Sequence, residues 1–227
     1  MADVSLEFKE ILKDEVRLFG LQACVPDDSL IELVLSKCAP VTYPKNSRII
    51  DEGSIDNNVY FLKSGLLRMS YYDEDREYTI GIANTGTVSL SPLSFVMSQK
   101  AHYMMTSCTK VELLRLAKED ADRLIAENAG FARWMLGLAL AQMAALEFKS
   151  KHLTGSSKDK YRNLMKREYI KKRYISFTRM QPDIVMDVSD KVIASYLGVH
   201  PAYLSALKRE IIEGERSGSD AAPGSLD

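Results

Sequence analysis

Cysteine is scarce in this 227-residue chain, and long apolar runs are missing altogether. The three cysteines, Cys24, Cys38 and Cys108, are too few and too scattered for a disulfide framework or for the four thiolates of an iron–sulfur cluster. No run approaches the roughly 18 apolar residues of a membrane span, and the start lacks the charged-then-apolar pattern of a secretory signal. We therefore expect a cytoplasmic protein that makes no contact with a membrane.

Histidine is equally scarce. The three histidines, His102, His152 and His200, lie in separate segments of the chain. A metal-dependent enzyme built on a β-roll needs a compact set of His and carboxylate ligands, and these positions do not form one in the sequence. We predict no metal site, no cofactor that the sequence identifies, and no enzymatic activity.

Charge is distributed unevenly, although the whole chain carries a net charge of only −1. Residues 1–147 hold 15 Lys and Arg against 21 Asp and Glu, whereas residues 148–211 hold 14 against 6. An acidic N-terminal part followed by a basic part indicates that only the basic part binds a polyanion. A basic face that is merely solvated is the alternative.

The spacing of apolar residues changes twice along the sequence, and this pattern predicts an α+β fold. Helical spacing dominates the first forty residues, and short apolar runs cut by turn formers extend from Val41 to Leu116. Such runs are typical of an antiparallel β-roll or sandwich. Helical spacing returns after Lys118, and residues 131–151 form a long helix candidate.

The long helix candidate, Phe131–Lys151, carries an apolar stripe. Its members at helical spacing are Trp134, Leu138, Ala141, Ala145 and Phe148. A stripe of this kind packs into the core of its own chain or forms the seam of a dimer. The sequence leaves both interpretations open.

The stretch from Val188 to Ile211 has the pattern of a helix-turn-helix motif. Apolar residues recur through it, and Gly198 lies where one short helix ends and the next begins. Pro201 suits the first position of the second helix, which we expect to reach about Ile212. Because the second helix of such a motif commonly lies in the major groove of DNA, this stretch predicts a DNA-binding protein.

Side chains suited to phosphates or base edges come from two segments of the basic part. The candidates are His200, Tyr203, Ser205, Lys208 and Arg209 on the second helix, and Lys171, Lys172 and Arg173 before it. We expect a β-roll domain with N-terminal helices over residues 1–127 and a dimerisation helix over residues 128–154. A helix-turn-helix domain over residues 155–213 and a disordered tail over residues 214–227 follow.

A glycine-bounded hairpin motif adds a family resemblance to this order of parts. Gly53 and Gly65 flank an aromatic and apolar strand, and both suit tight turns. Together with the helix-turn-helix, this motif resembles the cyclic-AMP receptor protein and fumarate-nitrate-reduction regulator (CRP/FNR) family over residues 29–212. The resemblance implies a double-stranded β-helix of the cyclic nucleotide-binding type and a winged-helix-like DNA-binding domain. It also implies a bacterial homodimer, joined through the Phe131–Lys151 helix, with DNA and RNA polymerase as partners.

The effector pocket departs from the family pattern. Members that bind cyclic nucleotides carry a Gly-Glu pair and an Arg-Ser or Arg-Thr pair, and these positions fall at about Leu90-Ser91 and Ala101-His102. A buried phosphate needs a charged or multiply hydrogen-bonded partner, so the resemblance predicts no ordinary response to cyclic AMP. Candidate residues for a different small-molecule effector are Ser89, Ser91, Lys100 and His102.

The DNA-reading positions depart as well. The family's base-reading Arg, Glu and Arg fall on Pro201, Ala202 and Ala206, none of which can make a bidentate contact with guanine. The leading hypothesis is a homodimeric transcription regulator that reads a different operator or relies on phosphates and DNA shape. The alternative is a ligand-binding or protein-interaction module that has lost sequence-specific DNA binding.

Overall fold

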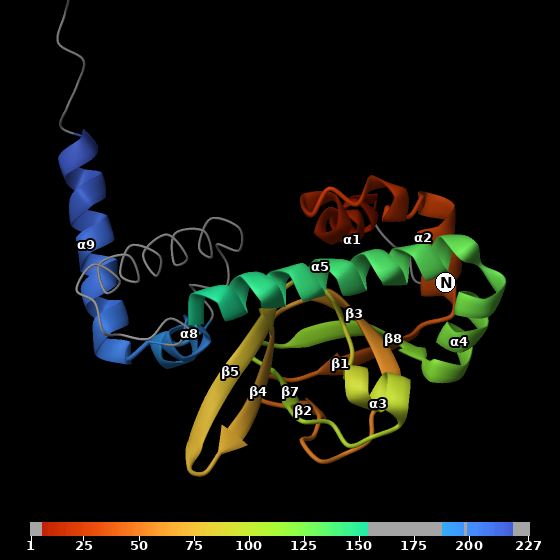
Figure 1. The fold of residues 1–227 in the computed structure, drawn as a ribbon, viewed down its shortest axis with the longest axis horizontal. Coiled ribbons are helices and arrows are strands. Elements are labelled where there is room, and N and C mark those ends of the chain that lie inside the picture. The colour runs from red at the N-terminus through yellow and green to blue at the C-terminus, as the bar shows by residue number, and fades with distance from the viewer. Residues whose placement is uncertain (1–5, 154–187, 198, 220–227) are drawn as a thin grey trace, which may run out of the picture. The chain divides into compact units, whose positions relative to one another are not determined.

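The computed structural model describes residues 6–153, 188–197 and 199–219. The chain divides into two units, Met1–Lys151 and His152–Asp227. The first unit holds the strands and most helices, and the second holds the helix pair near the C-terminus (Figure 1). The predicted DNA-contacting residues Lys171, Lys172 and Arg173 lie outside the described residues.

Eight strands of the first unit form two antiparallel sheets. Their bounds are β1 (Ala39–Tyr43), β2 (Arg48–Ile50), β3 (Asn58–Ser64), β4 (Leu67–Asp73), β5 (Arg76–Ala83), β6 (Val88–Ser89), β7 (Met104–Ser107) and β8 (Val111–Ala117). One sheet has the order β1-β8-β3-β6 and the other β2-β7-β4-β5. This confirms the predicted α+β class with antiparallel sheets in the middle of the unit.

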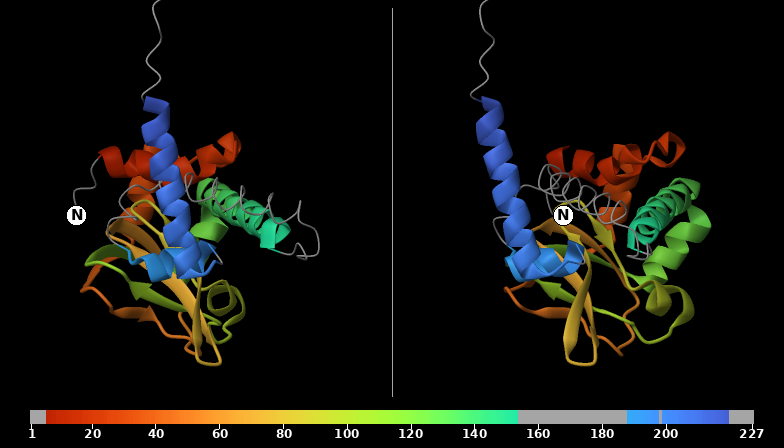
Figure 2. Two further views of the ribbon diagram at one scale, coloured as in Figure 1. Left: turned by 90° about the vertical axis from the view of Figure 1, so that its left-hand side faces the viewer. Right: turned by 60° about the vertical axis from the view of Figure 1, so that its left-hand side comes forward.

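Helices flank the strands in the first unit. They are α1 (Leu6–Leu18), the 3-10 helix η1 (Gln22–Cys24), α2 (Asp28–Ser36), α3 (Pro92–Met97), α4 (Lys118–Glu127) and α5 (Ala129–Leu153). Apart from the short α3, these helices gather on one side of the sheets (Figures 1 and 2). The second unit contains α8 (Asp190–Leu197) and α9 (Pro201–Ser219) among its described residues.

Gly53 and Gly65 lie in the turns before and after β3, as the sequence predicted. Gly53 and Gly65 adopt φ values of +81° and +91°, a region that other residues enter at a cost. At Gly65 an added Cβ would lie 2.3 Å from the carbonyl oxygen of Lys110. Only glycine therefore allows the β3–β4 turn to pass so close to the β7–β8 turn.

Two apolar clusters lie on opposite faces of β3 because successive side chains of a strand alternate. Leu62 points into the cluster between the sheets, with Leu67, Met105 and Leu113. Phe61 points into the cluster under the helices, where its ring centroid lies 5.7 Å from that of Trp134. This second cluster fixes α5 against the roll.

Helix α5 resolves the two interpretations of its apolar stripe. Trp134, Leu138 and Ala141 are buried within their own unit, so the stripe is core along this part of the helix. Ala145 and Phe148 lie in the helix, but their side chains are outside the described set. The small Gly137 lets η1 approach closely, since an added Cβ would lie 2.5 Å from the Cβ of Cys24.

A different face of α5 is apolar and exposed. It consists of Leu136, Leu140, Met143 and Leu146, which are between 41% and 64% exposed. We call it the outer face of α5. The burial of Trp134, Leu138 and Ala141 supports the interpretation of the predicted stripe as core, and dimerisation through this helix stays a prediction.

Helix α9 is longer than the sequence suggested. The expected end lay near Ile212 and a disordered tail was expected from Gly214, whereas the helix continues to Ser219. Gly214 lowers helix propensity, but the flanking Glu213, Glu215 and Arg216 are compatible with a helix. The expected tail therefore starts as helix over residues 214–219.

Candidate DNA-binding helix pair and effector region

A small apolar core joins α8 to α9. Ile193 and Leu197 on α8 and Leu204 and Leu207 on α9 are all at most 1% exposed. After α8 the backbone N–H of Val199 donates a hydrogen bond to the carbonyl of Ala194 at 3.0 Å. This bond is typical of a helix that ends in a tight turn. The pattern of apolar residues in the sequence thus predicted the buried face of this pair correctly.

His200 begins α9 as a cap. Its carbonyl accepts from the N–H of Tyr203 at 2.9 Å, and its Nδ1 accepts from the N–H of Ala202 at 3.3 Å. Because Nδ1 accepts this bond, the N–H that the ring can donate is the one on Nε2. Since His200 is exposed, this N–H is available to an acceptor such as a phosphate oxygen.

Lys208 forms an ion pair that the sequence did not reveal. Its Nζ contacts Oδ1 of Asp190 at the start of α8, and only 25% of its side chain is exposed. The ion pair fastens α9 to α8 and reduces the charge that Lys208 presents to a ligand. Asp190 lies 18 residues earlier, so no local spacing rule predicts their contact.

The first two turns of α9 expose mostly small residues. Pro201, Ala202, Ser205 and Ala206 are exposed there, followed along the helix by the exposed Arg209, Ile212 and Glu213. The Ser205 hydroxyl donates to the carbonyl of Pro201 at 3.1 Å, which leaves its lone pairs open. Tyr203 is half-buried, so of the five predicted residues on α9 only His200, Ser205 and Arg209 share full exposure.

Lys191 is a further exposed cation that sequence analysis missed. It lies in the first turn of α8, one residue after the Asp190 that binds Lys208. Its position could have identified it in the sequence, because Lys191 lies at the beginning of the first helix of the motif, and this helix commonly crosses the DNA backbone.

The predicted effector residues do not converge in the structure. Ser89 and Ser91 are buried at the end of β6 and the start of α3, whereas Lys100 and His102 are exposed. Ala101 between the two exposed residues is buried, because its backbone pairs with Gly53 and Ser54 at 2.8 and 2.7 Å. This pairing turns both neighbouring side chains outward.

The buried serines are satisfied within their own segment. The Ser91 hydroxyl donates to the Ser94 hydroxyl oxygen at 3.2 Å, and Ser94 donates to the carbonyl of Gln99 at 2.8 Å. Both bonds hold the short α3 and the chain after it in one conformation. The hydroxyls of Ser91 and Ser94 therefore stabilise the local conformation of the chain.

Tyr103 and Tyr60 are polar groups near this segment that the sequence did not single out. Tyr103 donates through its hydroxyl to the carbonyl of Leu90 at 2.5 Å. Burial, together with the nearby Asp56, raises the pKa of Tyr103 to about 12. Tyr60 donates to Asp56 at 2.9 Å, and its pKa is raised by burial and by that carboxylate. Both phenols stay protonated at neutral pH and serve as donors.

Charged groups inside the described part of the roll are few and engaged. Arg68 on β4 contacts Glu77 at 2.8 Å, and its Nε donates to Thr79 at 2.8 Å. Among the described residues the one charged side chain that is buried is Lys13, which pairs with Asp28 in the N-terminal helices. No described cation is thus left unpaired in the interior to neutralise a buried phosphate.

The described residues contain neither a membrane-spanning helix nor a metal-binding cluster. No helix among them is long and apolar enough to cross a membrane. No group of three or more His, Cys, Asp or Glu side chains in residues 6–153, 188–197 and 199–219 is arranged to hold a metal ion.

The chain is similar to known proteins in sequence over its roll and in fold over most of its length. Residues 40–128 match the family model described as Cyclic nucleotide-binding domain. No curated protein matches the sequence.

Solved structures match more of the chain. A CooA mutant from Carboxydothermus hydrogenoformans is 15% identical, with a TM-score of 0.62 and coverage of 84% of this chain and 87% of the other. The c-di-GMP responsive global regulator CLP of Xanthomonas campestris is 14% identical, with a TM-score of 0.60 and coverage of 83% and 93%. The Thermus thermophilus catabolite activator protein is 16% identical, with a TM-score of 0.50 and coverage of 83% and 85%. Residues 40–128 therefore resemble a cyclic nucleotide-binding domain, and the chain shares the fold of these solved structures over most of its length.

Proposed function

We propose that this protein is a homodimeric, DNA-binding transcription regulator of the CRP/FNR type that does not respond to cyclic AMP in the usual way. One observation carries the proposal. A cyclic nucleotide-binding domain shares the chain with a helix pair whose second helix is anchored by Leu204 and Leu207 and presents Ser205 and Arg209 outward. A helix anchored on one face and open on the other suits insertion into the major groove.

The outer face of α5 supports the homodimer. Leu136, Leu140 and Met143 recur at spacings of four and three residues, which places them on one side of a helix. Contiguous exposed apolar side chains are typical of interfaces. A second copy of the same helix offers the same surface, as a two-fold dimer requires, and it would supply the paired helix-turn-helix motifs that a palindromic site needs.

The chemistry of the roll supports a changed effector response. Leu90-Ser91 and Ala101-His102 stand where the resemblance places the charged pairs, and Arg68 is already bound to Glu77. A cyclic phosphate would gain no unpaired cation from the described interior. We expect isothermal titration with cyclic AMP to show no binding at micromolar concentrations, and a stoichiometric micromolar complex would contradict this part of the proposal.

Fluorescence anisotropy with DNA from the protein's own promoter region tests the proposal directly. We expect binding that weakens steeply as salt rises, because phosphate contacts release counterions. Replacing the exposed cation in Arg209→Ala should weaken binding about fivefold to tenfold and lower the salt slope by about 1. Lys110→Ala, which removes an exposed cation from the β7–β8 turn, is the matched control and should leave binding unchanged.

The second candidate function is a ligand-binding or protein-interaction module without specific DNA binding. The small, weakly charged face formed by Pro201, Ala202 and Ala206 favours it. If no fragment in a genome-wide DNA pull-down is enriched and the Arg209→Ala variant has the same DNA affinity as the parent, this second function replaces the first.

A further inference from the structure

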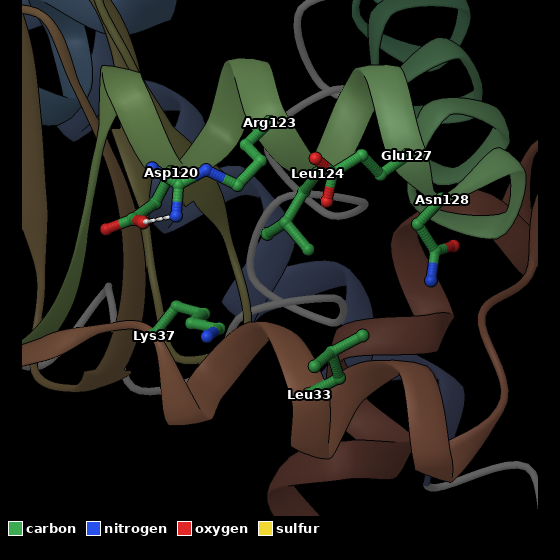
Figure 3. Close-up of a pocket in the computed structure, with 7 residues that line it drawn as sticks. All are labelled: Leu33, Lys37, Asp120, Arg123, Leu124, Glu127 and Asn128. Carbon is green, nitrogen blue, oxygen red and sulfur yellow. Dashed lines mark ion pairs between the residues drawn. The ribbon is translucent and has the colours of Figure 1, made fainter.

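A surface pocket of about 300 Å3 lies between α2 and α4 in the first unit (Figure 3). Its lining residues are Leu33, Lys37, Asp120, Arg123, Leu124, Glu127 and Asn128. The volume is at the small end of ligand sites and suits a molecule of about ten non-hydrogen atoms. None of these residues belongs to the effector region or to the helix pair.

The floor of the pocket is apolar. Leu33 from α2 and Leu124 from α4 face each other across its middle (Figure 3). Leu33 is 40% exposed, so part of its side chain is open to a molecule in the pocket. A short aliphatic side chain placed between them would remove apolar surface from water, mostly that of Leu33, because Leu124 is only 9% exposed.

The charges of the pocket leave one cation and one anion without a partner. Arg123 contacts Asp120 at 3.9 Å and so offsets its charge. Lys37 and Glu127 form no ion pair within the described part of the chain. Lys37 lies toward the end that holds the Arg123–Asp120 pair, and Glu127 lies above the middle (Figure 3).

Asn128 closes the other end with a fixed donor. Its Oδ1 accepts from the N–H of Phe131 at 3.0 Å and caps the start of α5. That bond fixes the orientation of the amide, so Nδ2 is the atom left to donate a hydrogen bond toward α2 (Figure 3).

We propose that this pocket binds a small zwitterion with an aliphatic side chain, of the class of free aliphatic amino acids. Lys37 receives the carboxylate, Glu127 receives the ammonium group, and Leu33 and Leu124 hold the side chain. Separate charges of opposite sign around an apolar floor match such a ligand and match neither a cyclic nucleotide nor a simple anion. Because Asn128 caps α5, an occupied pocket would also restrain the start of the helix that carries the outer face.

L-Leucine titrated into the full-length protein tests the proposal, with the methyl signals of Leu33 and Leu124 as the NMR readout. We expect both signals to shift and saturate with a dissociation constant on the order of 1 mM, since the charges are exposed and contribute modestly. L-Leucinamide, which lacks the carboxylate, and N-acetyl-leucine, which lacks the ammonium group, should each bind about fivefold more weakly.

Variants separate the two charge contacts. Lys37→Gln should weaken leucine binding about fivefold and abolish the advantage of leucine over leucinamide, and Glu127→Gln should abolish its advantage over N-acetyl-leucine. Lys110→Gln, an exposed lysine remote in sequence from the pocket, should bind like the parent.

Two results would overturn the proposal: unchanged Leu33 and Leu124 signals at about 20 mM leucine, or equal binding of leucine and leucinamide. The pocket lies wholly in the first unit, so its failure leaves DNA binding by the helix pair untouched.

Discussion

Helices α5 and α9 each bury one face in their own unit and present the other outward, but the two outward faces differ in chemistry. On α5 the outer face carries large apolar side chains, with Leu136 and Met143 54% and 64% exposed. On α9 the exposed residues of the first two turns are small, with Ala202, Ser205 and Ala206 among them, and Arg209 and Ile212 are exposed further along. Large apolar groups gain from meeting a similar surface, whereas small ones let a helix backbone approach a groove closely.

The difference shows that burial of one face does not define the role of the other. Leu204 on α9 and Trp134 on α5 are both fully buried, so each helix is anchored on its inner side. The outward residues then determine whether a helix meets another protein or a polar ligand. We expect substitutions on the inner faces to change stability and those on the outer faces to change association.

The largest expected effect is on the oligomeric state through α5. In the Leu136→Glu/Leu140→Glu double variant, charges would have to be buried against a second copy, and the dimer should be lost completely. Sedimentation velocity measures the change. Leu18→Glu on α1 is the control, because Leu18 is also an exposed leucine, 68% exposed, yet lies on another helix. A double variant that stays dimeric would remove the outer face of α5 from the interface.

The next largest effect concerns the inner faces. Trp134→Ala should lower the free energy of unfolding of the first unit by about 3–5 kcal/mol, and Leu204→Ala that of the second by about 2–5 kcal/mol. Leu136→Ala, at an exposed position on the same helix as Trp134, should change the free energy of unfolding of the first unit by less than about 0.5 kcal/mol. Urea denaturation with separate probes for each unit measures these values.

Trp134→Phe sharpens this comparison. The indole N–H of Trp134 is buried and has no hydrogen-bond partner among the described residues. Phenylalanine removes that unsatisfied donor as well as some volume, so the loss should be well below that of Trp134→Ala. A loss as large as that of the alanine variant would contradict this expectation, because it would mean that the phenylalanine ring recovers none of the packing that the indole provides.

A smaller, pH-dependent effect on stability is expected where Glu15 of α1 contacts Gln142 of α5. The carboxylate of Glu15 on α1 accepts from the side-chain amide of Gln142 on α5 and from the backbone of Val88, and burial raises its pKa. A carboxyl whose native pKa is raised holds its proton more tightly in the folded state, so the contribution of Glu15 to stability is highest at low pH. It falls as pH rises from about 4.3 through the native pKa.

Glu15→Gln removes this ionisation and should flatten that fall, leaving the variant relatively more stable at neutral pH. Urea denaturation between about pH 4 and pH 8 measures it. Glu7→Gln, an exposed position on the same helix, is the control. If parent and Glu15→Gln differ by the same amount at every pH, burial of this carboxylate does not limit stability.

The smallest effect is expected for the ion pair between α8 and α9. A double-mutant cycle of Lys208→Ala and Asp190→Ala should give a coupling energy of about 0.2–1 kcal/mol, because both side chains are partly exposed. Zero coupling together with weaker DNA binding by Lys208→Ala would assign Lys208 to the ligand rather than to helix packing.

Local patterns in the sequence predicted the features that depend on neighbouring residues. Gly53 and Gly65 were expected at turns, and their positive φ values are a property of the single residue and its neighbours. Leu204 and Leu207 were expected inside because helical spacing places them on one face. The antiparallel roll followed from runs of strand length separated by turn residues.

Features that depend on distant residues could not be predicted in the same way. On α5, Trp134 and Leu138 lie at the same helical spacing as Leu136 and Leu140, so periodicity alone could not say which pair packs inside. The exposure of two effector candidates could not be predicted for a related reason. The backbone pairing of Ala101 with the Gly53–Ser54 turn, which no local rule predicts, sends Lys100 and His102 outward.

By itself the sequence determined the order of strands and helices, the turns that require glycine and the buried side of the helix pair, because each depends on short-range spacing and on single-residue conformational limits. The tertiary structure alone decided which face of α5 stays exposed, that Lys208 is tied to Asp190, and that Leu33 and Leu124 share a pocket. These depend on side chains brought together across long stretches of chain, where packing, rather than spacing, selects the neighbours.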